Sequence, residues 1–86
     1  MTPATMPRAV RMRPVATADD GFAAAEILAE ALSEDPDAFE ALVPPGTTPK
    51  PVEISEDGSA ALFELYEGTD WEATNGAAIG RVIVRR

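Results

Sequence analysis

The chain has 86 residues, with fifteen acidic and seven basic side chains, a formal net charge of −8 at pH 7, no cysteine and no histidine. The length fits one small domain, and the composition excludes disulfides, thiolate nucleophiles, sulfur-based zinc sites and the commonest general base. No apolar run approaches the roughly 18 residues that span a bilayer, so we expect a cytoplasmic protein that does not enter membranes.

The N-terminal region is expected to contribute a flexible segment and then a strand. Residues 1–7 contain two prolines and no helix or strand pattern, so we expect this segment to be flexible. Residues 8–15 alternate in polarity, with Met12 on one face and Arg11 and Arg13 on the other, which predicts a first strand.

A long helix is predicted next. Thr17, followed three residues later by Asp20, is typical of a capping box at the start of a helix. Apolar residues then recur at helical spacing, and carboxylates gather on the opposite side. The pattern predicts a helix over residues 18–33.

A shorter helix and a connector follow. An aspartate before a proline predicts a second N-cap, with a helix over residues 36–43 that buries Phe39, Leu42 and Val43. Residues 44–51 contain four prolines, which predicts a stiff, extended connector with little room for regular structure.

The rest of the chain has the pattern of a strand meander. Residues 52–55 and 61–66 alternate in polarity on either side of Asp-Gly at 57–58, a hairpin turn signal. Asn-Gly at 75–76 is a second turn signal, and the apolar run 77–84 predicts a last strand.

This order of elements predicts the fold class. A strand, a long helix, a short helix and a meander are typical of an α+β domain with helices packed on an antiparallel sheet of three to five strands. We therefore expect residues 8–86 to form a single domain, in which Leu28 and Leu32 pack against the sheet face that carries Phe63 and Leu65.

The closest match to a ligand motif is a calcium-binding loop over residues 53–64. Its oxygen-bearing residues, its glycine and its final glutamate fit the spacing. However, prolines and a strand pattern flank it, whereas a calcium hand requires two helices. We interpret the segment as a hairpin and predict no metal site and no cofactor.

Other candidate functional residues are few. The serines have no histidine to activate them, and Lys50 lies between prolines, a poor place for the buried lysine of a serine-lysine pair. We therefore predict no catalytic residue and a protein that is not an enzyme. Tyr66 and Trp71 are candidates for interface anchors, but in so small a core they are more typical of half-buried packing.

The charges are segregated along the chain. Residues 14–80 contain all fifteen acids and one base, a net charge of −14, whereas each end of the chain carries three arginines. If the first and last strands are neighbours, Arg11, Arg13, Arg81 and Arg85 would share one basic patch. Otherwise they protect sheet edges and offset nearby carboxylates.

Residues 19–40 contain eight acids and no base. Glu26, Glu30 and Glu34 form an i, i+4 series of like charges, and each such pair costs about 0.2–0.5 kcal/mol. Glu30→Lys should then stabilise the isolated domain. The series either serves solubility alone or forms a partner-binding acidic face. The acidic face consists of Asp19, Glu26, Glu30, Glu34 and Asp37.

These observations favour a small, acidic, non-enzymatic interaction protein of a phage or a bacterium. The favoured function is an inhibitor whose acidic face occupies a basic, nucleic-acid-binding surface of a partner protein, as an anti-CRISPR or anti-restriction protein would. The alternative is a structural or accessory subunit that assembles through sheet edges, with the acidic face only solvating. The sign of the charge excludes direct DNA binding by the acidic face, and we expect a monomer or a homodimer.

Overall fold

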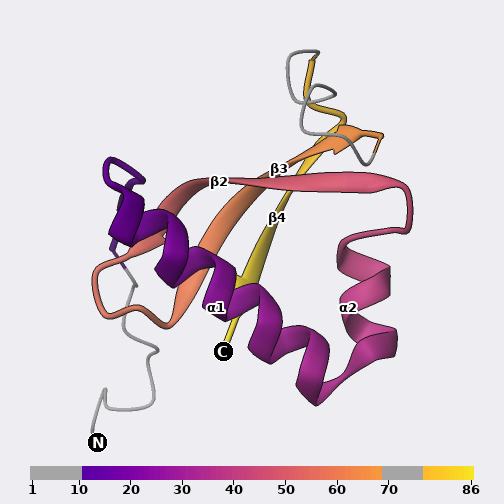
Figure 1. Cartoon of the computed structure of the whole chain (residues 1–86), viewed down its shortest axis with the longest axis horizontal. Helices are drawn as coiled ribbons and strands as arrows, with labels where there is room; N and C mark the ends of the chain where they lie inside the picture. Colours follow the sequence, from indigo (N-terminus) through magenta and orange to yellow (C-terminus); the bar gives the residue numbers. More distant parts are fainter. Residues whose placement is uncertain (1–10, 69–76) are drawn as a thin grey trace, which may run out of the picture.

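The computed structural model describes residues 11–68 and 77–86 (Figure 1). Over these ranges the protein is an α+β domain with two helices packed on a four-stranded antiparallel sheet, which confirms the predicted fold class. The elements are β1 (Met12–Pro14), α1 (Ala18–Glu34), α2 (Pro36–Leu42), β2 (Thr47–Ser55), β3 (Ala60–Glu67) and β4 (Gly80–Arg85).

The strands form a simple meander in the order β1-β2-β3-β4, and each pairs antiparallel with the next. Helix α1 lies across one face of this sheet, and α2 packs against α1 before the chain returns into β2 (Figure 1). Strands β1 and β4 are therefore the two edges of the sheet that the structure describes. The first and last strands are not neighbours, so the condition for one shared arginine patch is not met: Arg13 lies on β1, and Arg81 and Arg85 lie on β4 at the opposite edge.

Both predicted helix starts are confirmed. The Thr17 hydroxyl accepts a hydrogen bond from the backbone N–H of Asp20 at 3.2 Å, and the Asp20 carboxylate accepts one from the N–H of Thr17 at 3.3 Å. The Asp35 carboxylate accepts a hydrogen bond from the N–H of Ala38 at 3.1 Å, and Pro36 occupies the first turn of α2. These contacts satisfy N–H groups that have no partner within their own helix.

The core lies between α1 and the three longer strands. Ala24 and Ile27 of α1 are 0% and 1% exposed, while Leu28 is only partly buried. Leu32 is 48% exposed, so the expectation that it packs against the sheet is wrong. A helix turns by about 100° per residue, which puts Leu32 about 140° away from Ile27 around the axis. The buried core cluster consists of Ala24, Ile27, Ile54, Ala61, Phe63 and Val84.

The short helix contributes less to the core than expected. Val43, directly after α2, is 8% exposed, and Phe39 is partly buried. Leu42 is 40% exposed, so the expectation that it is buried is wrong. A helix of seven residues that packs on one side against α1 can turn only one row of side chains inward.

The expectation that residues 44–51 form an extended connector with little room for regular structure is wrong from Thr47 onward, because β2 begins there and runs through two prolines. Pro49 pairs with Leu65, whose carbonyl accepts a hydrogen bond from the N–H of Ile79 and therefore points away from β2. In an antiparallel pair, the partner Pro49 then also points away from β3, so its missing N–H leaves no gap in the ladder. Pro51, two residues on, has the same orientation, and β1 does not extend far enough to pair with either proline.

The hairpin between β2 and β3 is confirmed at the predicted turn. The N–H of Gly58 donates to the carbonyl of Ser55 at 3.1 Å, and Gly58 has a φ of 73°, in the left-handed region that glycine adopts without strain. The second predicted turn, at 75–76, and the side chain of Trp71 lie outside the described residues.

Candidate functional site

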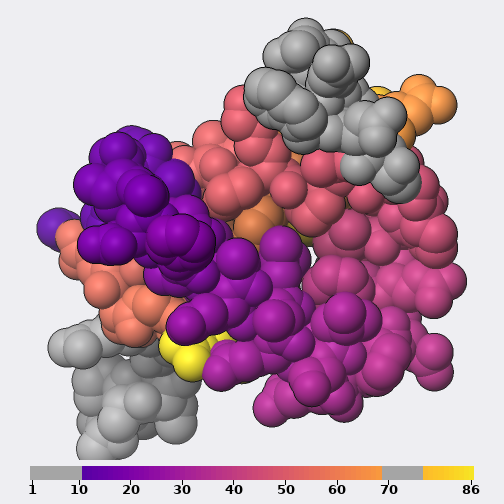
Figure 2. Space-filling view, in the orientation of Figure 1, coloured from indigo at the N-terminus to yellow at the C-terminus, as the bar shows by residue number. Residues whose placement is uncertain are grey.

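The five residues of the acidic face lie on the two helices, and all five are exposed. Four of them lie within an arc of about 80° around the axis of α1, so the helix places them along one side. These are Asp19, Glu26, Glu30 and Glu34. Asp37 lies in the first turn of α2 and thus on a separate element. In Figure 2 the side chains of α1 and α2 meet in one continuous surface.

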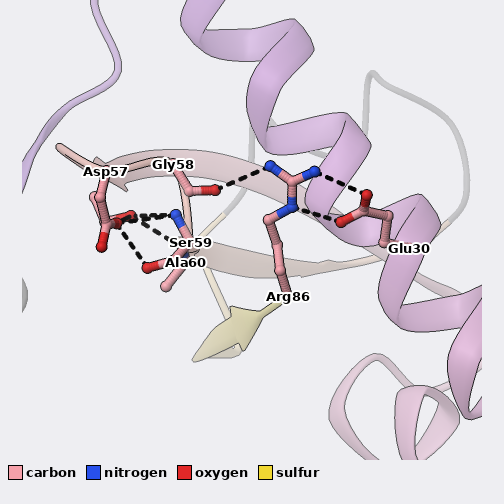
Figure 3. Close-up of polar contacts among 7 residues, drawn as sticks. Glu30, Asp57, Gly58, Ser59, Ala60 and Arg86 are labelled. Carbon is pink, nitrogen blue, oxygen red and sulfur yellow. Dashed lines mark hydrogen bonds and ion pairs between the residues drawn. The ribbon is translucent and has the colours of Figure 1, made fainter.

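One carboxylate of the acidic series is neutralised from the far end of the chain. The guanidinium of Arg86 donates to both carboxylate oxygens of Glu30, at 2.5 Å from Nε and 2.8 Å from Nη2 (Figure 3). This contact lowers the pKa of Glu30 and raises that of Arg86, which Glu26 raises slightly further. Glu30 is therefore not an unpaired member of a repulsive series, and a lysine in its place would face Arg86. This ion pair contradicts the reason for expecting Glu30→Lys to be stabilising, and we expect the substitution to destabilise the domain.

Asp20 is engaged in the fold and is not available to a partner. Its side chain is 10% exposed and forms a bidentate ion pair with Arg13. The N–O distances are 2.8 Å from Nη2 to Oδ1 and 2.9 Å from Nη1 to Oδ2. It also accepts hydrogen bonds from the backbone N–H groups of Ala16 and Thr17. These contacts, led by that from Arg13, hold the pKa of Asp20 well below its usual range. The pair fastens β1 to the first turn of α1.

Two of the side chains that matched a calcium loop, Ser55 and Asp57, bond to each other within the hairpin. The Asp57 carboxylate accepts hydrogen bonds from the hydroxyls of Ser59 and Ser55, at 2.6 and 2.8 Å, and from the N–H of Ser59 (Figure 3). These bonds lower the pKa of Asp57. The Ser55 hydroxyl in turn accepts hydrogen bonds from the N–H groups of Ser59 and Ala60. The cluster stabilises the turn.

A second polar group lies on the sheet. The Tyr66 hydroxyl donates to Glu64 at 3.0 Å, and Arg81 of β4 donates to the other oxygen of the same carboxylate at 3.2 Å. The carboxylate raises the pKa of Tyr66. Tyr66 is only 7% exposed, which favours its interpretation as a packing residue over an interface anchor.

Most acids of the two helices remain available to a partner. Of the eight acids in residues 19–40, Asp20 and Glu30 form ion pairs and Asp35 caps α2. The other five make no ion pair or side-chain hydrogen bond within the described ranges, and all are exposed. They are Asp19, Glu26, Glu34, Asp37 and Glu40. Negative charge thus persists along one side of α1 and onto α2.

An apolar row follows α1 on the side away from the sheet, which the sequence interpretation missed. Phe22 is 70% exposed and Leu32 is 48% exposed, and Ala25 and Ala29 between them are also exposed. We call these four residues the outer stripe. Their spacing of three, four and three residues aligns them along the helix, and this spacing was the signal available in the sequence. Glu26 adjoins the stripe, because it lies four residues from Phe22 and three from Ala29.

Comparisons with protein families, with curated proteins and with solved structures gave no match. Neither α1 nor α2 is long and apolar enough to cross a membrane. Any functional conclusion therefore depends on the exposed surfaces of the described residues, among them the acidic face and the outer stripe.

Proposed function

We propose that this chain is a small, non-enzymatic, cytoplasmic interaction protein that binds a basic surface of a partner protein through its acidic face. The observation that supports the proposal is the charge of the two helices. Residues 19–40 contain eight acids and no base, and five of those acids have no ion-pair partner within the described ranges. Unneutralised carboxylates on a rigid helix produce a directed field that attracts a basic surface and accelerates its encounter.

The partner surface that best complements this field is one that binds nucleic acid. Such surfaces present lysines and arginines to phosphate groups, and a row of carboxylates offers them charges of the same sign. The bound protein would compete with nucleic acid and act as an inhibitor. Proteins of phages or bacteria that act in this way include the anti-CRISPR and anti-restriction types.

A second candidate function is assembly, as an accessory subunit, through the edge of the sheet at β4. It is favoured by the exposure of two isoleucines, Ile79 at 59% and Ile83 at 49%. Exposed apolar side chains on an edge strand invite pairing with another strand. Arg81 and Arg85 of β4 alternate along the chain with Ile79, which directly precedes the strand, and with Ile83. They favour a partner other than a second copy, because an antiparallel pair that puts Ile83 opposite Ile83 also puts Arg81 opposite Arg85.

The decisive experiment compares two variants of equal charge. Glu26→Lys with Glu34→Lys reverses two charges of the acidic face, and Glu56→Lys with Glu67→Lys reverses two exposed charges elsewhere. Each substitution changes the charge by two, so both variants move from −8 to −4. The parent and both variants are immobilised, and proteins of the source cells are captured at low salt and at about 0.5 M salt, where the Debye length falls well below 8 Å.

We expect the parent and the second variant to capture the same partner at low salt, with release at high salt, and the first variant to lose it. Equal capture by all three proteins would contradict the proposal and direct attention to β4. In that case Ile83→Lys should abolish the capture. An equal loss in both variants would mean that only net charge matters, which would also contradict a specific acidic face.

A further inference from the structure

The outer stripe is an exposed apolar surface that the fold does not use. Helix α1 buries its opposite side against the sheet through Ala24 and Ile27, and so is already held in place. Phe22 and Leu32 nevertheless remain 70% and 48% exposed, ten residues apart, or about 15 Å along the axis. Large exposed apolar side chains in one row are typical of an interaction surface.

The shape of the stripe suits another helix. Its spacing of three, four and three residues is that of the contact positions of a coiled coil. The alanines at positions 25 and 29 carry little bulk, so a second helix axis can approach closely between Phe22 and Leu32. The two large side chains would then insert between side chains of that helix, as knobs into holes.

The charges beside the stripe indicate the composition of that helix. Asp19 and Glu26 of the acidic face lie along one flank of the stripe, three residues before and four residues after Phe22, and neither has an ion-pair partner within the described ranges. A helix packed on the stripe would place its own flanking side chains against these carboxylates. Lysine or arginine at those positions forms attractive pairs, whereas glutamate repels.

The same charges disfavour a second copy of the chain as the occupant. In an antiparallel pair of α1 helices, Phe22 would face Leu32 of the other copy and Ala25 would face Ala29, so the apolar residues match. A two-fold axis would, however, put the acidic faces of both copies on the same side of the interface. Each copy also carries a net charge of −8. The apolar match is therefore opposed by repulsion between like charges.

We propose that the outer stripe is the docking site for a basic amphipathic helix of the partner protein. The proposal rests on the proposed function and makes it specific, because the basic surface becomes one helix with an apolar row and flanking lysines or arginines. The apolar row contacts the outer stripe, and the cationic flank contacts Asp19 and Glu26. Contact in this mode buries the apolar surface of Phe22 and Leu32, which the fold leaves in solvent.

The test uses two synthetic peptides and the full chain. One peptide has about three heptads with leucine at positions a and d and lysine at e and g, and the other has glutamate in place of lysine. Like charges at e and g keep each peptide from pairing with itself. Binding of the fluorescently labelled peptides is followed by anisotropy at low ionic strength.

Four variants of the chain are compared with the parent. The stripe variant combines Phe22→Ala with Leu32→Ala, and its matched control combines Ile79→Ala with Ile83→Ala, which have similar exposure elsewhere. The charge variant combines Asp19→Lys with Glu26→Lys. Circular dichroism checks that each variant retains its helices. The fourth variant, the glutamine variant, combines Ala25→Gln with Ala29→Gln and obstructs close approach without removing any buried side chain.

We expect the parent to bind the lysine peptide and not the glutamate peptide. The stripe variant and the glutamine variant should bind at least about tenfold more weakly, and the isoleucine control should bind as the parent does. The charge variant should also weaken binding, with a defect that shrinks as salt is added.

Two results would separate failure of this inference from failure of the proposed function. If the lysine peptide binds the parent and the stripe variant equally while the charge variant loses it, the stripe is not the docking site and the acidic face still is. If only the stripe variant loses binding and both peptides bind equally, charge does not select the partner and the proposed function fails. Absence of binding by the parent, or a dimer that the stripe variant dissociates, would overturn the inference.

Discussion

Alanine substitutions along α1 measure which side of the helix supports the fold. Ile27 is 1% exposed and belongs to the buried cluster that also contains Phe63 and Val84. Ile27→Ala removes buried methyl and methylene groups and leaves a cavity, so its cost should be about 2–5 kcal/mol. Leu28 is only partly buried, so Leu28→Ala should lower the free energy of unfolding by less.

Leu32 should give a much smaller effect. Full burial of a leucine side chain contributes about 1.5–3 kcal/mol, and Leu32 is 48% exposed, so about half of that contribution, roughly 1 kcal/mol, is at stake. No closed cavity forms at the surface, and the higher helix propensity of alanine offsets a few tenths of a kcal/mol. We expect the order Ile27→Ala, Leu28→Ala, Leu32→Ala from largest to smallest loss.

Urea denaturation followed by circular dichroism measures the three losses, provided that the slope of the free energy of unfolding against urea stays constant. At about 0.05–0.15 kcal/mol per residue, a domain of 86 residues has a total stability of roughly 4–13 kcal/mol, so Ile27→Ala can unfold it. Ile27→Val, with a cost of about 0.5–1.5 kcal/mol, is the milder companion. A loss for Leu32→Ala as large as that for Ile27→Ala would refute this orientation of α1, and the outer stripe with it.

Three other substitutions test local features. An added Cβ at Gly21 meets no atom within 4 Å, so Gly21→Ala should raise the free energy of unfolding by about 0.5–1 kcal/mol, and an unchanged urea midpoint would contradict this. The pKa of Asp20 is lowered in the folded state. Its contribution to the free energy of unfolding is therefore complete above the unfolded pKa of about 4 and is lost as the pH falls below that unfolded value. Melting temperatures between about pH 6 and 2 should therefore fall less steeply in Asp20→Asn than in the parent, although that variant is less stable at neutral pH. Glu30→Lys should lower the melting temperature and Glu30→Lys with Arg86→Glu should partly restore it; a stabilised single variant would mean that repulsion within the acidic face outweighs the ion pair.

Features encoded by neighbouring residues could be predicted from the sequence. The start of α1 at Thr17 and Asp20, and the turn at Gly58, depend on side chains and backbone angles within a few residues of each other. Such short-range preferences do not require knowledge of the rest of the fold. The order of the elements was sufficient to predict the α+β class for the same reason.

The tertiary structure decided what depends on distant partners. Alanines lie on several sides of α1, so the apolar pattern left its rotation open, and contact with the sheet selected Ile27 and exposed Leu32. Pairing with β3 made a strand of residues 47–51, because each proline falls where no hydrogen bond to β3 is needed. Arg86 joins Glu30 across 56 positions of the chain, and no local pattern reports such a pairing. Whether a carboxylate is paired with an arginine or left to a partner protein is therefore settled only by how the sheet and the helix pack.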